Sequence, residues 1–101
     1  MNSRDSRLRD IIIDAMRELE KQLKALANRR RLMILSCLKK RREASVGDIA
    51  ADIHLSFKST SRHLAVLAAL DIVEKEQRSL QVFYRLAAAP SSTVKHVIAQ
   101  L

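Results

Sequence analysis

The sequence contains very few of the residues that interrupt helices, cross-link chains or stack. Among 101 residues there are one glycine, one proline, one cysteine and three aromatic side chains, none of them tryptophan. A single cysteine excludes an internal disulfide and a cysteine-pair metal site. A single glycine excludes a glycine-rich phosphate loop. The composition therefore favours helices joined by short turns, with nothing that argues for an oxidising compartment.

Long apolar runs are also missing. The longest one near the N-terminus is Ile11 to Ile13, which is too short for a signal-peptide core or a membrane span. No set of residues resembles a nucleophile with its base and orienting acid. We therefore expect a cytoplasmic protein that is not an enzyme, has no cofactor and has no membrane partner. At this length the chain reads as one domain over residues 1–101.

Acidic residues are outnumbered: 19 Lys and Arg stand against 11 Asp and Glu, a formal net charge of +8. Seven cations and no acid lie between Asn28 and Arg42. Positive charge alone is explained by solubility, but clustered charge suits a polyanion, because phosphates release counterions when cations bind them. The predicted partner is double-stranded DNA.

The first helix is predicted from apolar residues that recur every three or four positions from Leu8 to Leu26. Ile11 and Ile13 fall beside this stripe and widen its apolar arc. One arc covers the domain's own core, and the surplus predicts a homodimer through the first and last helices. The predicted interface consists of Leu8, Ile11, Ile12, Met16, Val94, Val97, Ile98 and Leu101.

Three capping residues divide the middle of the chain. Asn28 is predicted to begin a second helix, Ser45 a short third helix with Asp48 at its third position, and Ser56 a fourth helix. The turn before Ser56 is tight, and the fourth helix is polar at its start and aliphatic from Leu64 onward. Two helices in this relation form a helix-turn-helix.

The pattern changes to strands after Asp71. Residues 72–73 and 82–84 are β-branched or aromatic and are separated by a polar segment, which predicts a hairpin with its tip near Arg78 and Ser79. Pro90 is predicted to open a last helix. The fold class is therefore mainly α with a small β part: a winged helix-turn-helix of about five helices and a two-stranded wing.

Three separated segments resemble the ArsR/SmtB family of bacterial winged helix-turn-helix repressors. They are KALANRRRLMILSCL (24–38), SFKSTSRHLAVL (56–67) and VFYRL (82–86), similar to the family patterns KALSDPTRLRIL, SQPTVSHHLKVL and VYYRL. The resemblance covers about two thirds of the chain. It implies a DNA-binding transcriptional regulator in which the fourth helix enters the major groove.

The family's metal-sensing features are not found here. Where metal-sensing relatives carry a thiol pair on the third helix, this chain has Ser45 and Gly47, and its last helix offers only His96 and no acid. Zinc needs three or four ligands in one place. We therefore expect no metal and place the protein in the branch that does not sense metals. The sequence does not identify a small-molecule inducer.

The polar start of the fourth helix is the predicted reading element. Arg62 and Lys58 share a face and are expected to meet base edges, with Arg62 suited to a guanine. The wing arginine and the start of the second helix are expected to meet phosphate, although Arg31 is equally suited to an internal ion pair. The role of Phe57 stays open: its ring is suited either to packing in the turn or to contact with a thymine methyl group. The predicted DNA-binding residues are Arg29, Arg30, Ser56, Lys58, Ser59, Thr60, Ser61, Arg62 and Arg78.

Two other side chains have a plain and a sharper interpretation. Cys37 lies in an apolar helix, which favours a small core residue over a redox switch. His63 is expected to make a structural hydrogen bond rather than to ligate or catalyse. The function predicted is a homodimeric repressor that binds an inverted repeat and occludes a promoter. The alternatives are a winged helix used as a protein-interaction module and a nucleoid-like protein that binds DNA without sequence preference.

Overall fold

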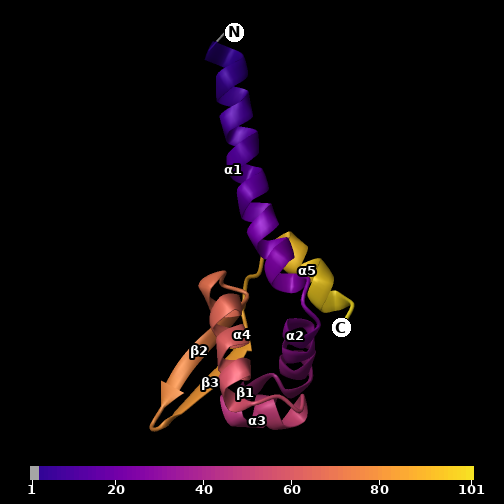
Figure 1. The fold of residues 1–101 in the computed structure, drawn as a ribbon, viewed down its shortest axis with the longest axis vertical. Coiled ribbons are helices and arrows are strands. Elements are labelled where there is room, and N and C mark those ends of the chain that lie inside the picture. Colours follow the sequence, from indigo (N-terminus) through magenta and orange to yellow (C-terminus); the bar gives the residue numbers. More distant parts are fainter. Residues whose placement is uncertain (1–2) are drawn as a thin grey trace.

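A computed structural model describes residues 3–101 of the chain. Helices and strands follow the predicted order, with one additional strand (Figure 1). The elements are α1 (Ser3–Leu26), α2 (Arg29–Arg41), β1 (Glu43–Ser45), α3 (Val46–Asp52), α4 (Phe57–Ala69), β2 (Val73–Arg78), β3 (Gln81–Leu86) and α5 (Ser92–Ala99). The predicted class, a mainly α winged helix-turn-helix, is confirmed.

The predicted starts of the second, third and fourth helices are confirmed. They could be predicted because each depends on a local hydrogen bond. In each case the side-chain oxygen of the capping residue accepts from the backbone N–H three residues later. The last helix differs slightly: Ser91, not Pro90, is its cap. The three predicted caps and their donors are Asn28 with Arg31, Ser45 with Asp48, and Ser56 with Ser59, each at 3.1 Å.

The core lies between α2, α3, α4 and the sheet, where aliphatic side chains are fully enclosed. α5 closes one end of it. Val94 is only 2% exposed, so it supports the fold and does not present a surface for a partner, contrary to our expectation. Val97, Ile98 and Leu101 pack partly against the same core. The aliphatic side chains of α2, α3 and α4 that are fully buried are Ile34, Leu35, Leu38, Ile49, Leu64 and Leu67.

The sheet has three antiparallel strands in the order β1-β3-β2. The predicted wing is the β2–β3 hairpin, in which Arg78 pairs with Gln81. The tip is thus Ser79 and Leu80, one residue further along than expected. β1 was not predicted, because three residues are too few to show an alternating pattern. It follows Arg42, whose φ of 69° turns the chain out of α2.

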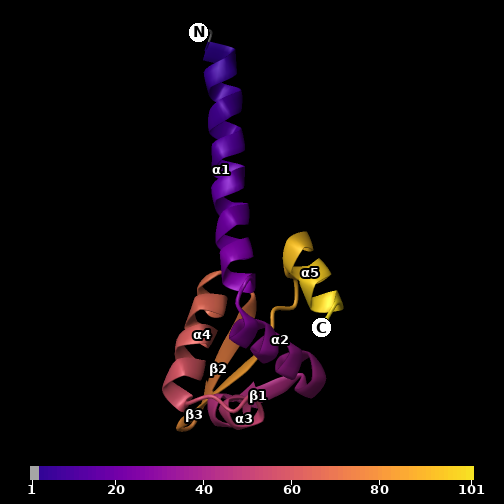
Figure 2. The same ribbon diagram turned by 45° about the vertical axis from the view of Figure 1, so that its right-hand side comes forward.

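α1 projects from the rest of the molecule, and with it the molecule measures 56 Å along its longest axis (Figures 1 and 2). Among its described side chains only Ala25 and Leu26, at its end, are buried. Its apolar stripe is open to solvent, with Leu8 59% and Ile11 62% exposed. Within residues 3–101 no helix combines the length and the apolar character that crossing a membrane requires.

Candidate nucleic-acid interface

The start of α4 presents one polar face outward and one inward. The inward face holds Thr60, which is 0% exposed and whose hydroxyl donates to the Ser56 carbonyl at 2.8 Å. Thr60 therefore stabilises the first turn and cannot touch a ligand, so its place in the predicted DNA-binding set is corrected. Ser56 uses its hydroxyl to cap the helix. Ser59 is half-buried.

The outward face is a continuous strip along two turns. A shallow groove runs over Phe57, Lys58, Ser61, Arg62 and Ala65, which we call the reading face. These positions are three or four residues apart, the spacing of one helical face. The structure therefore brings together the predicted residues Lys58, Ser61 and Arg62, and it adds Phe57, whose ring is 63% exposed.

The two cations of the reading face are electrostatically free. Within residues 3–101 neither Lys58 nor Arg62 has an ion pair or a side-chain hydrogen bond. Arg41, by contrast, is held by Asp52, with 2.9 Å between Arg41 Nη2 and Asp52 Oδ1. Folding leaves the cations of α4 uncompensated, so their interaction energy is available to an anionic partner.

The wing arginine is in the opposite situation. Nη2 of Arg78 lies 2.9 Å from Glu43 Oε2 and 2.6 Å from Glu76 Oε2, and its guanidinium sits 4.7 Å from the centre of the Phe83 ring. These hydrogen bonds raise the pKa of Arg78, and the bond from Arg78 lowers the pKa of Glu43. Arg85 joins the same cluster through Glu76, at 3.5 Å, and it also pairs with Glu74. Arg78 thus fastens the wing to β1, and it reaches phosphate only by leaving both carboxylates.

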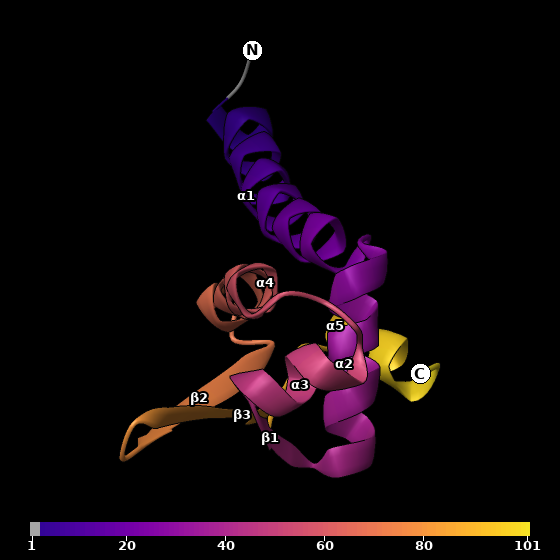
Figure 3. The same cartoon turned by 60° about the horizontal axis from the view of Figure 1, so that its bottom comes forward.

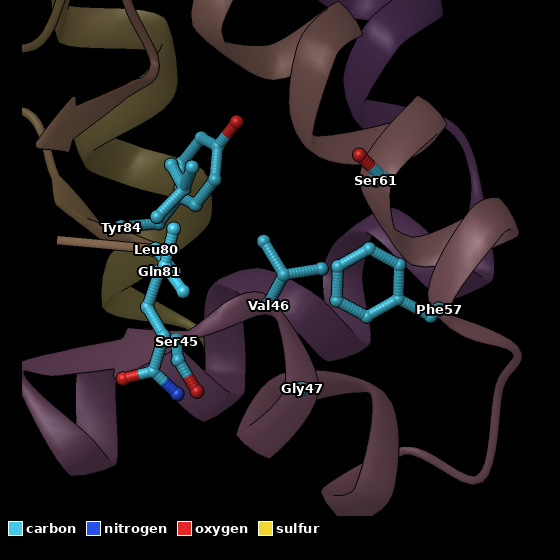
Figure 4. Close-up of a pocket in the computed structure, with 9 residues that line it drawn as sticks. Ser45, Val46, Gly47, Phe57, Ser61, Leu80, Gln81 and Tyr84 are labelled. Atoms are coloured by element: carbon cyan, nitrogen blue, oxygen red, sulfur yellow. The ribbon is translucent and has the colours of Figure 1, made fainter. Parts of the chain in front are cut away.

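A hollow of about 270 Å³ separates α4 from the wing (Figure 4). Phe57 and Ser61 of α4 lie on one side, and the hairpin residues Leu80 and Gln81 lie on the other. Tyr84 of β3 and the first residues of α3 also line it. Figure 3 looks onto this end of the molecule, where α3, the start of α4 and the hairpin lie together. The reading face and the wing tip are thus presented toward the same side.

The structure does not bring the predicted residues of α2 into this assembly. Arg31 lines a surface depression with Val66 and Leu70, so α2 begins beside the C-terminal end of α4. α4 has 13 residues, and at about 1.5 Å per residue the other end is roughly 20 Å away. Arg29 and Arg30 are exposed at the start of α2. They therefore lie far from Lys58 and Arg62, which are at the start of α4.

Arg31 serves an internal role, as one of our two interpretations had it, but its partners are not acids. Its Nη1 donates to the Ala25 carbonyl at 3.2 Å, at the C-terminal end of α1, where a cation is favourable. Its Nε–H donates to Nδ1 of His63 at 3.2 Å, which confirms the structural hydrogen bond expected for that histidine. Burial, and then the nearby Arg31 and Arg30, lower the pKa of His63. His63 is thus neutral near pH 7, with its proton on Nε2.

Cys37 is half-buried against the core, and its Sγ donates a hydrogen bond to Asp52 Oδ2 at 3.3 Å. Burial and then this hydrogen bond raise the pKa of the thiol from 9.0 to about 11. The reactive species of a cysteine is the thiolate, and here it is suppressed. The arrangement favours the core interpretation of Cys37 over the redox switch.

We expect the thiol to react about 100-fold more slowly with iodoacetamide at pH 7.5 than a thiol with a pKa of 9.0, because each unit of pKa removes tenfold of the thiolate. The rate should rise tenfold per pH unit until about pH 11. Asp52→Asn removes the negative charge that disfavours the thiolate and should accelerate the reaction. A rate that levels off near pH 9 in the unmodified protein would contradict this.

Metal-ligating residues do not gather in the part of the chain that the structure describes. No three His, Cys, Asp or Glu side chains lie close enough there to hold an ion. The three histidines come from different elements: His54 from the turn before α4, His63 from α4 and His96 from α5.

Two wing residues that the sequence analysis did not name are also candidates for contact with DNA. Leu80 is 96% exposed at the tip, and Lys75, on the strand face shared with Tyr84, has no ion pair within residues 3–101. The hairpin register would have revealed both. In a two-residue loop, RSLQ places Ser and Leu at the tip, and every second residue of β2 then shares a face.

Known proteins with similar sequences identify the family. The profile of the family described as "Bacterial regulatory protein, arsR family" matches residues 28–75. The transcriptional activator HlyU of Vibrio cholerae is 41% identical over 76 residues, which cover 75% of this chain and 67% of that protein. The chain belongs to the arsR family. The winged helix-turn-helix resemblance noted in its sequence is thereby confirmed.

Further relatives agree in sequence and in fold. The biofilm growth-associated repressor of Agrobacterium fabrum is 40% identical over 65 residues, which cover 64% of this chain and 55% of that protein. The structure of HlyU superimposes with a TM-score of 0.72 at 36% identity, over 85% of this chain and 89% of that one. A homodimeric winged helix-turn-helix DNA-binding domain of Mycobacterium bovis gives a TM-score of 0.73 at 28% identity, over 87% and 78% of the two chains.

Proposed function

We propose that this regulatory protein is a homodimeric, sequence-specific DNA-binding repressor. The single observation that carries the proposal is the reading face, where Lys58 and Arg62 remain unpaired although the wing arginines are neutralised. A helix that presents free cations and short hydroxyls at its start suits the major groove. The protein is expected to act in the cytosol, where its DNA target lies.

Dimerisation is supported by the bare apolar stripe of α1. Leu8, Ile11, Ile12 and Met16 are each at least half exposed, which is unusual for side chains that have no partner. The Mycobacterium bovis relative is described as homodimeric. A two-fold dimer presents two reading faces related by symmetry, so the expected operator is an inverted repeat. Val97, Ile98 and Leu101 are only partly buried against the core, and we propose that they lie at the edge of this interface.

Repression follows from occupancy. A dimer that covers two half-sites within a promoter excludes polymerase without further contacts. The relatives include both kinds of regulator: HlyU is described as an activator and the Agrobacterium protein as a repressor. We propose repression that is independent of transition metals, because the described residues form no ligand group and α3 lacks a thiol pair. Stoichiometric zinc is expected to leave DNA affinity unchanged.

The test is selection of bound sequences from a random pool of DNA duplexes. Enrichment of an inverted repeat is the expected result. Uniform recovery would favour nucleoid-like binding, because free cations alone bind phosphate without sequence preference. No recovery would favour the protein-interaction module. The same selection with Lys58→Ala should yield a repeat with a relaxed position in each half-site.

The phosphate contact predicted for Arg78 leads to a separate expectation about Glu43. Arg78 must exchange carboxylate for phosphate, so removing one carboxylate should favour the exchange. Glu43→Gln is expected to raise affinity for all DNA sequences by a few-fold and to steepen the salt dependence by about one ion per subunit. Titrations at several salt concentrations measure both. Glu18→Gln, far away on α1, is the control for lost charge. A fall in affinity would mean that Glu43 is needed to hold the wing in place.

A further inference from the structure

The wing tip is built in an unfavourable way. Its two-residue loop consists of Ser79 and Leu80, and Ser79 has a φ of 56°. Hairpin loops of this length favour glycine or asparagine in the left-handed region, and other residues are strained there. The gain from the strained turn is not internal packing, because Leu80 is 96% exposed. Strain that is retained for an exposed side chain points to a contact outside the chain.

A single exposed leucine is ordinary on a protein surface, so its position decides the matter. Leu80 is at the outermost point of the hairpin. The tip lies at the same end of the molecule as α3 and the start of α4 (Figures 1 and 2). Across the 270 Å³ hollow it faces the side of Phe57 and Ser61. A surface that meets the reading face therefore meets Leu80 as well.

The groups around Leu80 do not form a cationic clamp. Arg78, two residues before it, is bound by Glu43 and Glu76, and its neighbours in the loop and β3 are the uncharged Ser79 and Gln81. The loop itself therefore offers a branched apolar side chain and a hydroxyl, whether Arg78 keeps its carboxylates or exchanges them for phosphate. Phosphate is a poor partner for this chemistry, whereas the edges and faces of bases are suitable.

When α4 lies in the major groove, an element beside it crosses one sugar–phosphate strand and meets the adjacent minor groove. The hollow between α4 and the hairpin leaves room for that strand, with the hydroxyl of Ser61 and the amide of Gln81 on its two sides. Apolar side chains that enter the minor groove act as wedges that partly unstack a base step and bend the duplex. Pyrimidine–purine steps unstack most easily.

We propose that Leu80 of each protomer enters the minor groove at the flank of its half-site, unstacks one base step and bends the operator. This rests on the proposed function, because the wedge requires α4 in the neighbouring major groove. It adds a readout of DNA deformability at positions that α4 does not touch. A flexible TA or CA step is expected there in the selected sequences.

The experiment uses duplexes that carry the selected repeat with 2-aminopurine at successive positions outside each half-site. The full-length protein is expected to raise fluorescence at one position, which marks unstacking. Leu80→Ala should abolish that rise and weaken binding by about tenfold, with an unchanged salt slope because no phosphate contact is lost. Met33→Ala, at an exposed apolar residue of α2, is the matched control and should bind like the parent. Thermal unfolding should be the same for all three proteins.

The outcomes separate the wedge from the proposed function. A parent protein that binds the repeat without any rise in fluorescence overturns the wedge and leaves sequence-specific binding intact. The wedge also fails if Leu80→Ala keeps both the rise in fluorescence and the affinity. If that variant nevertheless loses repression of a reporter, Leu80 would be assigned to a protein partner. A parent that binds no duplex overturns the proposed function and the wedge with it.

Discussion

Ile12→Asp is expected to convert the proposed dimer into a monomer and to weaken binding to the proposed inverted repeat by at least about 100-fold. Ile12 is 50% exposed on the apolar stripe of α1, beside Met16 at 53%. A carboxylate at this position would have to lose its water when two copies of α1 meet, and an unpaired buried charge is strongly unfavourable. Each α4 would then bind its half-site alone, without the effective concentration that the second protomer supplies. Sedimentation and titration of the DNA measure the two effects.

Arg17→Asp is the matched control, because it also introduces a carboxylate on α1. Position 17 is five residues from position 12, about 140° around the helix, and Arg17 is exposed. This variant should remain dimeric. Val97→Asp is a poorer test, since Val97 packs partly on the core and a charge there would also destabilise the fold. If Ile12→Asp sedimented as a dimer, the interface would have to lie elsewhere than on the α1 stripe.

Much of the fold could be predicted because its decisive interactions are local. The caps Asn28, Ser45 and Ser56 each bond to the backbone three residues away, so the sequence around them was sufficient. The same holds for the change from helical to strand pattern after Asp71. The hairpin tip was misplaced by one residue because no Asn-Gly or Asp-Gly pair marks it.

The errors in the site came from long-range contacts and from one neglected pattern. Arg78 is held by Glu43, which is 35 residues earlier, and the pairing depends on β1, a strand too short to be recognised in sequence. Thr60, by contrast, was predictable as buried. It continues the spacing of Leu64 and Leu67, both 0% exposed, at intervals of four and three residues. Its hydroxyl suggested the surface, but periodicity placed it inside.

The residues of the reading face could be chosen from the sequence. Whether their charges are paired with carboxylates could not be predicted, because that depends on the fold. Lys58 and Arg62 are cations like Arg41 and Arg85, yet only the latter two find carboxylates in the fold. An unpaired cation keeps its full attraction for phosphates and base edges, whereas a paired one must first break its bonds. The net charge of +8 is unchanged by these ion pairs, but fewer cations are free to bind an anionic partner than the composition suggests.

Arg62→Ala is expected to cost about 1–3 kcal/mol on the preferred operator and to flatten discrimination at one position of each half-site. Its guanidinium is exposed, unpaired within residues 3–101 and placed on the reading face beside Lys58. An arginine there can donate two hydrogen bonds to the O6 and N7 of a guanine, and alanine leaves that edge unread. Binding to random DNA should change little, because phosphate contacts position the protein and base contacts specify the sequence. Titrations of the selected operator, its single-base variants and random duplex measure the difference.

Lys95→Ala provides the matched loss of one cation, because Lys95 is exposed on α5, away from α4. It should lower affinity slightly and equally for every sequence. Both variants should unfold at the parent's temperature, since neither side chain packs in the core. If Arg62→Ala instead weakened all duplexes alike while Leu80→Ala changed the preferred sequence within the half-site, the wing would be the reader and α4 the anchor. The free charge on α4 would then serve only to hold phosphate, and specificity would come from deformation of the flanking steps.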